Sequence, residues 1–599
     1  MFEDSSTGVE NRTTPWRGSC AISTATVVLV AVAVYANTVA NQPVLDDGWV
    51  IFHNPLIKSL KNVPRIFQAP YNVALTGTNA GLYRPVTMLT YALNYASGGS
   101  NVVGYHLVNI ALHVACTLAV LGLARVLLAS SRAALLAALL FAVHPVHVEA
   151  VTSLVGRAEL LAALGSLTCL YLTCTRHRAR WRLVAALALL VLGVLSKENA
   201  AVTPLLWGLI AIALPSAAGL QARPGFSGAI PRQALVRAIA IGAAMVCATA
   251  VYFVSRPAAG PAGASQWFDG QPPGVIFNTM TRALAEYLRL LVWPHPLGVD
   301  FYYSNEIPFT QQFTAACLAA TAVWVAALAA GVFLLRRAPV FAIGILWIFV
   351  ALLPVLNIVP IGVLMAERLL YLPSAGFCLA AGTGAAMLIE RARTPPRWAA
   401  LTVVVLLAFG VKTWVRNTDW RDGLSLWQAE LRKEPLDAVV NNNLAVEYTS
   451  RGELAEARER LEVALRTNPG YWRAHVNLGI VEHKLHDDAA AVRSLEQAHR
   501  LDPSAASPDF FMALVLADQG DLSRAVEYLA RAEKAEPLDA RTPLFRGWYL
   551  FRLGRLDEAT EELSRAAALD PGNPEPRTYL DQVARSRSGM ASESTPSGK

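Results

Sequence analysis

Apolar segments close to twenty residues long recur between residues 21 and about 415 of this 599-residue chain and then stop. About twenty apolar residues is the length that a helix needs to cross the hydrocarbon core of a bilayer. Because backbone groups in lipid must be satisfied within the segment, each stretch is expected to be a helix. A composition of 54% hydrophobic and 16% charged residues is likewise typical of a membrane protein. We expect eleven spans, at 21–40, 104–124, 132–147, 155–175, 182–197, 200–215, 236–254, 313–335, 339–358, 367–389 and 398–415.

Basic residues concentrate in five of the loops between these spans, and all five loops fall on the same side of the membrane. By the positive-inside rule that side is the cytoplasm. These loops also account for the formal net charge of +7, so the charge does not indicate a nucleic-acid partner. The basic groups are Arg125 with Arg132, the stretch 176–182, Arg223 with Arg232 and Arg237, Arg336–Arg337, and the stretch 391–397.

This orientation divides the remaining segments between the two sides of the membrane. Residues 1–20 become a cytoplasmic segment, and since they lack the features of a cleavable signal peptide, the first span is expected to stay as an anchor. The loop 41–103, the turn 144–150, the connection 255–312 and everything after the eleventh span lie on the extracytoplasmic side. That side is the periplasm if the membrane is a bacterial inner membrane, and the lumen if it is a eukaryotic endoplasmic reticulum membrane.

The hydrophilic part of the chain has an internal period of 34 residues. Prolines, alanines and leucines recur at this step, and glycine recurs in one slot that His486 fills once. This is the tetratricopeptide-repeat pattern, in which pairs of antiparallel helices stack into a solenoid with a concave groove. The recurring residues are Pro435, Pro469, Pro503, Pro537 and Pro571, Ala457, Ala491, Ala525 and Ala559, Leu461, Leu495, Leu529 and Leu563, and Gly452, Gly520 and Gly554.

The expected fold class is therefore all-α, with a polytopic membrane domain at 21–415 followed by an α-solenoid. The segment 416–436 is a linker with a partial repeat, 437–570 holds four repeats of 34 residues, and 571–599 is a cap and a disordered tail. The groove suits an extended peptide, and a spacer or an oligomerisation arm is the alternative role for the repeats.

Ionisable residues gather in the segments assigned to the extracytoplasmic side. Charged groups at membrane depth are costly and usually face a cavity or a partner, so their convergence on one face favours a site. The groups are Asp46 and Asp47 after the first span, Tyr83 and Arg84 later in that loop, His106 in the second span, His144, His147 and Glu149 in the next outer turn, then Arg157, Lys197, Glu198, Glu367 and Arg368.

Each of these groups has a structural alternative. Lys197 with Glu198, and Glu367 with Arg368, could be ion pairs that lock helices, and His106 could pack in the core. His144 and His147 do not have a recognised zinc spacing, so a structural or substrate-contacting role is favoured for both. One of the two adjacent aspartates could cap the following segment, but a cap accounts for only one of them.

Six motifs in chain order, followed by the repeats, resemble one family. They are VLDDGWVIFHNP (44–55), YRPVTMLTYALNY (83–95), GYHLVNIALH (104–113), LLFAVHPVHVEAVTSLVGRAELLA (139–162), LSKENA (195–200) and MAERLLYLPSAGFCL (365–379). Nearly the whole chain resembles the transmembrane and tetratricopeptide-repeat (TMTC-like) protein O-mannosyltransferases, which are GT-C glycosyltransferases. The resemblance implies an inverting transfer of a sugar from a polyprenyl-phosphate donor lipid to protein Ser/Thr hydroxyls. No phosphate-cradling glycine loop is present, which agrees with a donor supplied by the membrane lipids.

The resemblance also implies roles for individual residues. Asp46 is the expected general base, and Asp47 holds the acceptor or a divalent metal such as Mg²⁺ or Mn²⁺. Glu149 is the second acid and another ligand if a metal is present. The lipid phosphate is expected on Arg84, Arg157, Lys197 or Arg368, since basic side chains bind phosphate oxygens. The further substrate contacts implied are Tyr83, His106, His144, His147, Glu198 and Glu367.

The sequence leaves the acceptor and the sugar open. The array is short, and the alanine- and arginine-rich composition indicates a GC-rich bacterial genome, so the sugar need not be mannose. A glycolipid or a cell-wall glycan is the alternative acceptor, and a non-enzymatic membrane-anchored repeat scaffold is the alternative function.

Overall fold

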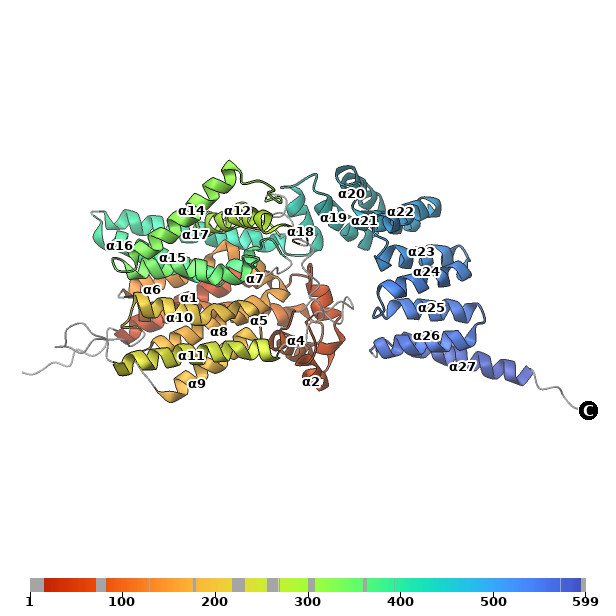
Figure 1. The fold of residues 1–599 in the computed structure, drawn as a ribbon, viewed down its shortest axis with the longest axis horizontal. Coiled ribbons are helices and arrows are strands. Elements are labelled where there is room, and N and C mark those ends of the chain that lie inside the picture. Colours follow the sequence, from red (N-terminus) through yellow and green to blue (C-terminus); the bar gives the residue numbers. More distant parts are fainter. Residues whose placement is uncertain are drawn as a thin grey trace, which may run out of the picture.

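The computed structural model describes residues 16–71, 82–128, 130–175, 179–217, 232–255, 268, 270–299, 307–358, 363–392, 394–570 and 572–593. Within these ranges every regular element is helical and no β-strand occurs. The all-α expectation is confirmed. A bundle of apolar helices forms one part of the molecule, and the repeat array stands at one end of it (Figure 1).

The bundle is built from helices whose apolar residues face both one another and the outside. Its helices are α1 (Trp16–Tyr35), α5 (Val102–Leu127), α6 (Ser131–Val143), α8 (Arg157–Cys174), α9 (Arg180–Val194), α10 (Thr203–Ala213), α11 (Arg232–Ser255), α14 (Ala315–Leu334), α15 (Pro339–Leu352), α16 (Pro373–Arg391) and α17 (Pro395–Asp419). Small residues allow close approach between them. A Cβ added at Gly376 on α16 would lie 2.6 Å from the Gly344 carbonyl oxygen on α15, so these two helices meet at their backbones.

The expected count of eleven spans is not confirmed. Six helical stretches among the described residues are long and apolar enough to cross a membrane, or seven if α6 is joined to the bent segment after it. The other expected spans correspond to α9, α10 and α15, which have 15, 11 and 14 residues, and to the 19-residue α16. Two helices, α4 (Pro85–Gly98) and α12 (Pro273–Val292), lie where loops were expected.

Short helical turns connect the bundle helices at the end that faces the repeats. They are η2 (Gly48–Phe52), η5 (Pro145–His147), α7 (Val148–Thr152), η6 (Leu154–Gly156), η7 (Glu198–Val202) and η9 (Glu367–Leu370). Figure 1 shows α4, α7 and α2 (Val63–Ile66) toward this end of the bundle, where α18 (Gly423–Leu431), the first helix after α17, also lies. The segments carrying many of the expected site residues therefore share one end of the bundle.

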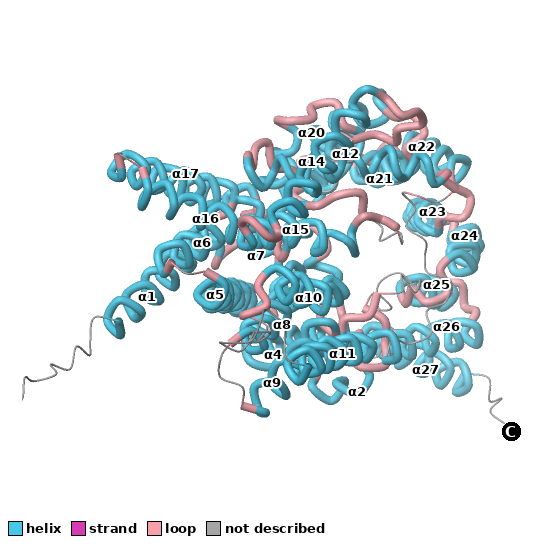
Figure 2. The backbone as a smooth tube through the Cα atoms, turned by 60° about the vertical axis from the view of Figure 1, so that its left-hand side comes forward, coloured by secondary structure: helices cyan, strands magenta, loops and turns pink. Residues whose placement is uncertain are grey.

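The repeat helices are α19 (Ala438–Ser450), α20 (Leu454–Thr467), α21 (Trp472–Lys484), α22 (Asp488–Leu501), α23 (Ala506–Asp518), α24 (Leu522–Ala535), α25 (Arg541–Arg552) and α26 (Leu556–Leu569), followed by α27 (Glu575–Glu593). Figure 2 shows them following one another along an arc beside the bundle. The recurring alanines and leucines are fully buried between paired helices, for example Ala491 and Leu495 at 0% exposure. The recurring glycines adopt φ of +78° to +88° after the first helix of a pair, and His486 adopts +62° in the equivalent slot.

A buried polar junction ties the start of the array to the loop that follows α1. The Asn41 side-chain amide donates to the Trp420 carbonyl at 3.0 Å, and the Gln42 N–H donates to the Arg421 carbonyl at 2.7 Å. The Asn417 amide, at the end of α17, donates to the Asn37 side chain at 2.9 Å. The loop after α1 and the last helix of the bundle are thus held together where the array begins.

Candidate active site

A cavity of about 710 Å³ opens between the bundle end and the repeat array. The bundle contributes acidic and basic side chains from four separate connections. The array contributes residues from the first helices of three repeats. The charged side chains that line the cavity are Asp46, Arg84, Glu149, Glu159, Lys197, Glu198 and Arg368 from the bundle, with Arg473 and Arg541 from the array.

The two adjacent aspartates occupy different environments. Asp46 is exposed and lines the cavity, whereas Asp47 is 1% exposed. The Asp47 carboxylate accepts from the Val155 N–H at 2.8 Å, from the Ser153 hydroxyl at 3.2 Å and from the Val44 N–H at 3.2 Å. Burial raises the pKa of Asp47 to about 6, although these hydrogen bonds favour the ionised form. Asp47 therefore fixes the turn from which Asp46 projects.

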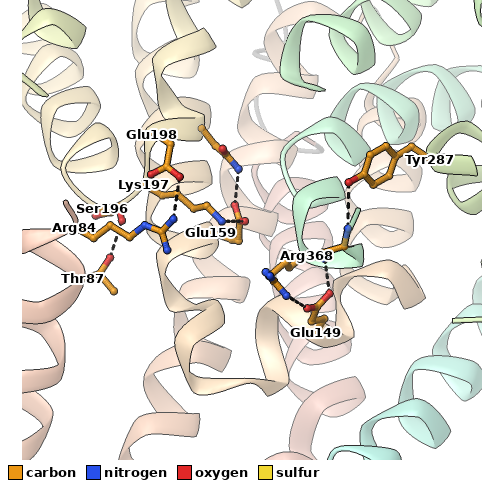
Figure 3. Close-up of polar contacts among 11 residues, drawn as sticks. Arg84, Thr87, Glu149, Glu159, Ser196, Lys197, Glu198, Tyr287 and Arg368 are labelled. Atoms are coloured by element: carbon orange, nitrogen blue, oxygen red, sulfur yellow. Dashed lines mark hydrogen bonds and ion pairs between the residues drawn. The ribbon is translucent and has the colours of Figure 1, made fainter. Parts of the chain in front are cut away.

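Two ion pairs form one wall of the cavity (Figure 3). Arg84, just before α4, contacts Glu198 at the start of η7 at 2.9 Å. Lys197 pairs with Glu159 in the first turn of α8, and the other oxygen of Glu159 accepts from the Asn199 amide at 3.0 Å. The position of Arg84 relative to Glu198 is fixed by a neighbouring link, made of two hydrogen bonds to backbone carbonyls.

That link joins α4 to the turn after α9. The Thr87 hydroxyl donates to the Ser196 carbonyl at 3.0 Å, and the Val86 N–H donates to the Leu195 carbonyl at 3.3 Å. Because these bonds hold the two segments in register, Arg84 and Glu198 meet even though 114 positions separate them in the sequence.

A third ion pair lies apart from the first two (Figure 3). Glu149 on α7 accepts from the Arg368 N–H at 2.9 Å and pairs with its guanidinium. The segment just before η9 is anchored by the Ala366 N–H, which donates to the Tyr287 hydroxyl on α12 at 3.2 Å. Arg368 remains 24% exposed and lines the cavity, whereas Glu149 is 1% exposed. In this pair the Arg368 guanidinium faces the cavity, and the Glu149 carboxylate lies behind it.

Several expected substrate contacts do not line the cavity. The Tyr83 hydroxyl donates to the Phe67 carbonyl at 2.9 Å, and Glu367 is fully buried and accepts from the Gly298 N–H at 2.5 Å. Three histidines each contact another part of the bundle through a ring nitrogen: His106 with the Asn41 carbonyl at 3.1 Å, His144 with the Leu291 carbonyl at 3.0 Å, and His147 with the Ser374 hydroxyl at 2.7 Å.

Arg157 is also outside the cavity. Its guanidinium is fully buried and donates to the Asn109 side chain at 2.9 Å, the Asn94 side chain at 2.6 Å and the Tyr105 carbonyl at 3.0 Å. It also lies over the Tyr91 ring, 4.8 Å from the centroid. In this position Arg157 joins α4, α5 and α8.

The cavity also includes residues that were not expected as site residues. Trp49, 56% exposed, lies three positions after Asp46 on η2, and Glu159 and Asn199 complete the Lys197 pair. Arg473 and Arg541 come from the array and are two repeats apart. Their spacing of 68 residues is visible in the sequence as twice the repeat period, but their facing the bundle depends on how the array docks.

The carboxylates expected to hold a metal are occupied by protein donors. Asp47 accepts from three groups, and both oxygens of Glu149 are engaged by Arg368. Within the described ranges no group of three or more His, Cys, Asp or Glu side chains has a metal-binding arrangement. Asp47 and Glu149 therefore do not fit a divalent metal as a pair, and no step is assigned to one.

Comparison with known families gives two matches. Residues 84–227 match the dolichyl-phosphate-mannose-protein mannosyltransferase model, and residues 442–506 and 512–574 match a tetratricopeptide-repeat model. The first match begins at Arg84 and includes Glu149, Glu159 and Lys197.

Curated relatives match over most of this chain. Protein O-mannosyl-transferase F38B6.6 of Caenorhabditis elegans is 28% identical over 74% of this chain and 63% of its own length. TMTC3 of Mus musculus is 27% identical over 80% and 54%, and Tmtc2 of Drosophila melanogaster is 34% identical over 45% and 29%. The chain thus spans less than two thirds of the length of these curated relatives.

The domain matches and the relatives agree with the fold. Several helices are long and apolar enough to cross a membrane, and both matched domains lie in the expected order along the chain. The chain is therefore a multi-pass membrane protein with the domain content of the transmembrane and tetratricopeptide-repeat (TMTC) protein O-mannosyltransferases, and the resemblance expected from its six motifs is confirmed.

Proposed function

We propose that this protein transfers a sugar, most simply mannose, from a polyprenyl-phosphate donor to Ser/Thr hydroxyls of polypeptides. The observation that carries the proposal is the shared cavity, in which an exposed carboxylate and three basic side chains of the bundle face the repeat array. The names of the relatives, which are protein O-mannosyl-transferases, support the reaction class.

Asp46 is the proposed general base. The acceptor oxygen attacks the anomeric carbon, its proton passes to the Asp46 carboxylate, and the bond from that carbon to the phosphate oxygen breaks with inversion. The electron pair of that bond leaves with the polyprenyl phosphate. A base for this step must reach the acceptor hydroxyl, and Asp46 is exposed in the cavity, whereas Asp47 is enclosed by its three donors.

Arg84, Lys197 and Arg368 are proposed to bind the phosphate. Each is held by a carboxylate, Glu198, Glu159 or Glu149, so the cations are positioned before substrate arrives. Positioned donors stabilise the charge that develops on the leaving phosphate without further reorganisation. The acidic partners also keep the empty cavity close to neutral.

The bundle end that carries the cavity is proposed to face the periplasm of a bacterial inner membrane, or the lumen of the endoplasmic reticulum. The basic loops described from the sequence support this orientation. A glycan acceptor is the less supported alternative, because the cavity wall opposite the bundle is made by repeats suited to polypeptides.

The test is transfer from defined polyprenyl-phosphate sugars to Ser/Thr peptides by the full-length protein in nanodiscs. Asp46→Asn is expected to abolish transfer while peptide and lipid binding persist, because the side chain is exposed and the shape is kept. Wild-type protein that transfers none of the sugars to any peptide, yet glycosylates a lipid or glycan acceptor, would overturn the polypeptide assignment.

A further inference from the structure

The face of the array that lines the cavity has a regular row of residues. Arg473, Ser507 and Arg541 lie 34 residues apart, at the equivalent early position of α21, α23 and α25, and all three line the cavity. The residue four positions later points to the same side of a helix, and Phe511, which follows Ser507 by four, also lines the cavity. The array residues that form this wall of the cavity therefore occupy equivalent positions in successive repeats.

Two rows of residues on this face of the array contain no acidic side chain. The two rows at these positions read Val439, Arg473, Ser507 and Arg541, then Asn443, Asn477, Phe511 and Phe545. Neither row contains Asp or Glu. An extended ligand lying along the rows meets amide, aromatic and arginine side chains, and its own negative charges are not repelled there.

The two arginines differ in how they are held. The Arg541 guanidinium donates to Asp539 through Nε at 3.1 Å and through a terminal nitrogen at 2.8 Å. Arg473 lies over the ring of its neighbour Trp472, 4.6 Å from the centroid, and is exposed. Within the described part of the chain no carboxylate forms an ion pair with Arg473. Arg473 therefore lines the cavity without an ion-pair partner among the described residues, while Arg541 is paired with Asp539.

We propose that the protein favours acceptor segments carrying Asp or Glu close to the acceptor Ser/Thr, and that Arg473 binds that carboxylate. The inference rests on the proposed function and specifies its acceptor class. A phosphate of the donor is the less favoured partner for Arg473. The bundle wall already supplies Arg84, Lys197 and Arg368 for the phosphate, whereas Arg473 belongs to the opposite wall.

The experiment compares three fluorescent peptides that differ only at the residues flanking one Ser/Thr, which are Asp, Ala or Lys. Binding to full-length protein in nanodiscs is measured by anisotropy, and transfer by its KM for peptide and for donor. Wild-type protein is expected to bind the Asp peptide roughly three- to tenfold more tightly than the Ala peptide, with the advantage shrinking at high salt.

Arg473→Glu is expected to remove this preference and to favour the Lys peptide, without a change in the KM for donor. Arg473→Gln serves as a second variant, and should equalise the three peptides. Arg493→Glu is the matched control, since Arg493 is exposed on the second helix of the same repeat and does not line the cavity. Asp539→Asn, which releases Arg541, should strengthen binding of the Asp peptide.

The outcomes separate this inference from the proposed function. Equal binding of the three peptides by wild-type protein, or an unchanged preference in Arg473→Glu, overturns the acidic-acceptor inference even if transfer occurs. A higher KM for donor in Arg473→Glu with all peptides overturns it as well, and assigns Arg473 to the phosphate. Absence of transfer to any peptide, with the binding preference intact, contradicts the proposed function alone.

Discussion

Arg368 holds Glu149 through two different groups, its backbone N–H at 2.9 Å and its guanidinium. The backbone bond fixes η9 against α7, and the side-chain pair sets the direction of the guanidinium toward the cavity. One carboxylate thus both joins two connections of the bundle and positions a cation in the candidate active site. Since Glu149 is 1% exposed, the pair has little solvent around its acidic half.

Glu149→Gln is expected to destabilise the protein by about 3 kcal/mol, because removing one partner of a buried pair leaves the other charge uncompensated. The change should lower the thermal denaturation midpoint in detergent and reduce transfer. Glu390→Gln is the control, since Glu390 pairs with Arg132 at 3.3 Å and both are about half exposed, so its effect should stay below about 1 kcal/mol. Similar shifts for the two variants would contradict the structural role of Glu149.

Asp47 is expected to make the folding stability of the protein depend on pH. Its pKa is raised from 3.8 to about 6, so the folded state binds the Asp47 proton more tightly than the unfolded state does. The resulting stabilisation is complete below about pH 4 and is lost as pH rises through about 6. A shift of this size corresponds to about 3 kcal/mol.

Asp47→Asn removes this titration. The difference in stability between wild-type protein and the variant should therefore decline between about pH 4 and 6 and level off above that range. Thermal denaturation midpoints measured across this range give the comparison, with Asp46→Asn as the exposed control. Parallel curves for wild-type protein and Asp47→Asn would show that the pKa of Asp47 is ordinary.

Arg157 and Arg84 should respond differently to replacement by lysine. Arg157→Lys is expected to destabilise the protein by about 2–4 kcal/mol, because a lysine cannot reach Asn109, Asn94 and the Tyr105 carbonyl together. Arg84→Lys keeps a charge beside Glu198 and should change stability less, while raising the KM for donor. Denaturation midpoints and donor kinetics separate the two, and a rise in donor KM for both variants at unchanged stability would place Arg157 in the site.

The repeats could be predicted from the sequence because each buried position is repeated every 34 residues. Ala491, Leu495 and the φ > 0 slot at His486 follow from that period alone. The lengths of the bundle helices could not be predicted as well. Apolar residues continue through bends and short turns, so a hydropathy window does not show that α10 has only 11 residues.

The sequence indicated only some of the residues that line the cavity. Arg84, Lys197, Glu198 and Arg368 could be assigned to one face because their loops share a side of the membrane. Sequence could not show which side chains point into the cavity. Arg157 is as charged as Arg84, yet three partners enclose it, and only the docking of the array brings Arg473 into the cavity that Asp46 lines.

His486 is the one position of the repeat turn at which a residue with a Cβ adopts φ of +62° within the described ranges, while Gly452, Gly520 and Gly554 fill the equivalent slots. Glycine adopts this conformation without the steric cost that a side chain incurs, so His486→Gly is expected to stabilise the second repeat by about 1 kcal/mol. Hydrogen exchange of α21 and α22 in the full-length protein should slow.

The reverse change, Gly520→Ala, should accelerate exchange in α23 and α24. His475→Gly is the matched control, because His475 lies inside α21, where glycine costs about 1 kcal/mol, and exchange there should become faster. Faster exchange in His486→Gly as well would mean that contacts of the imidazole outweigh the backbone strain at this turn.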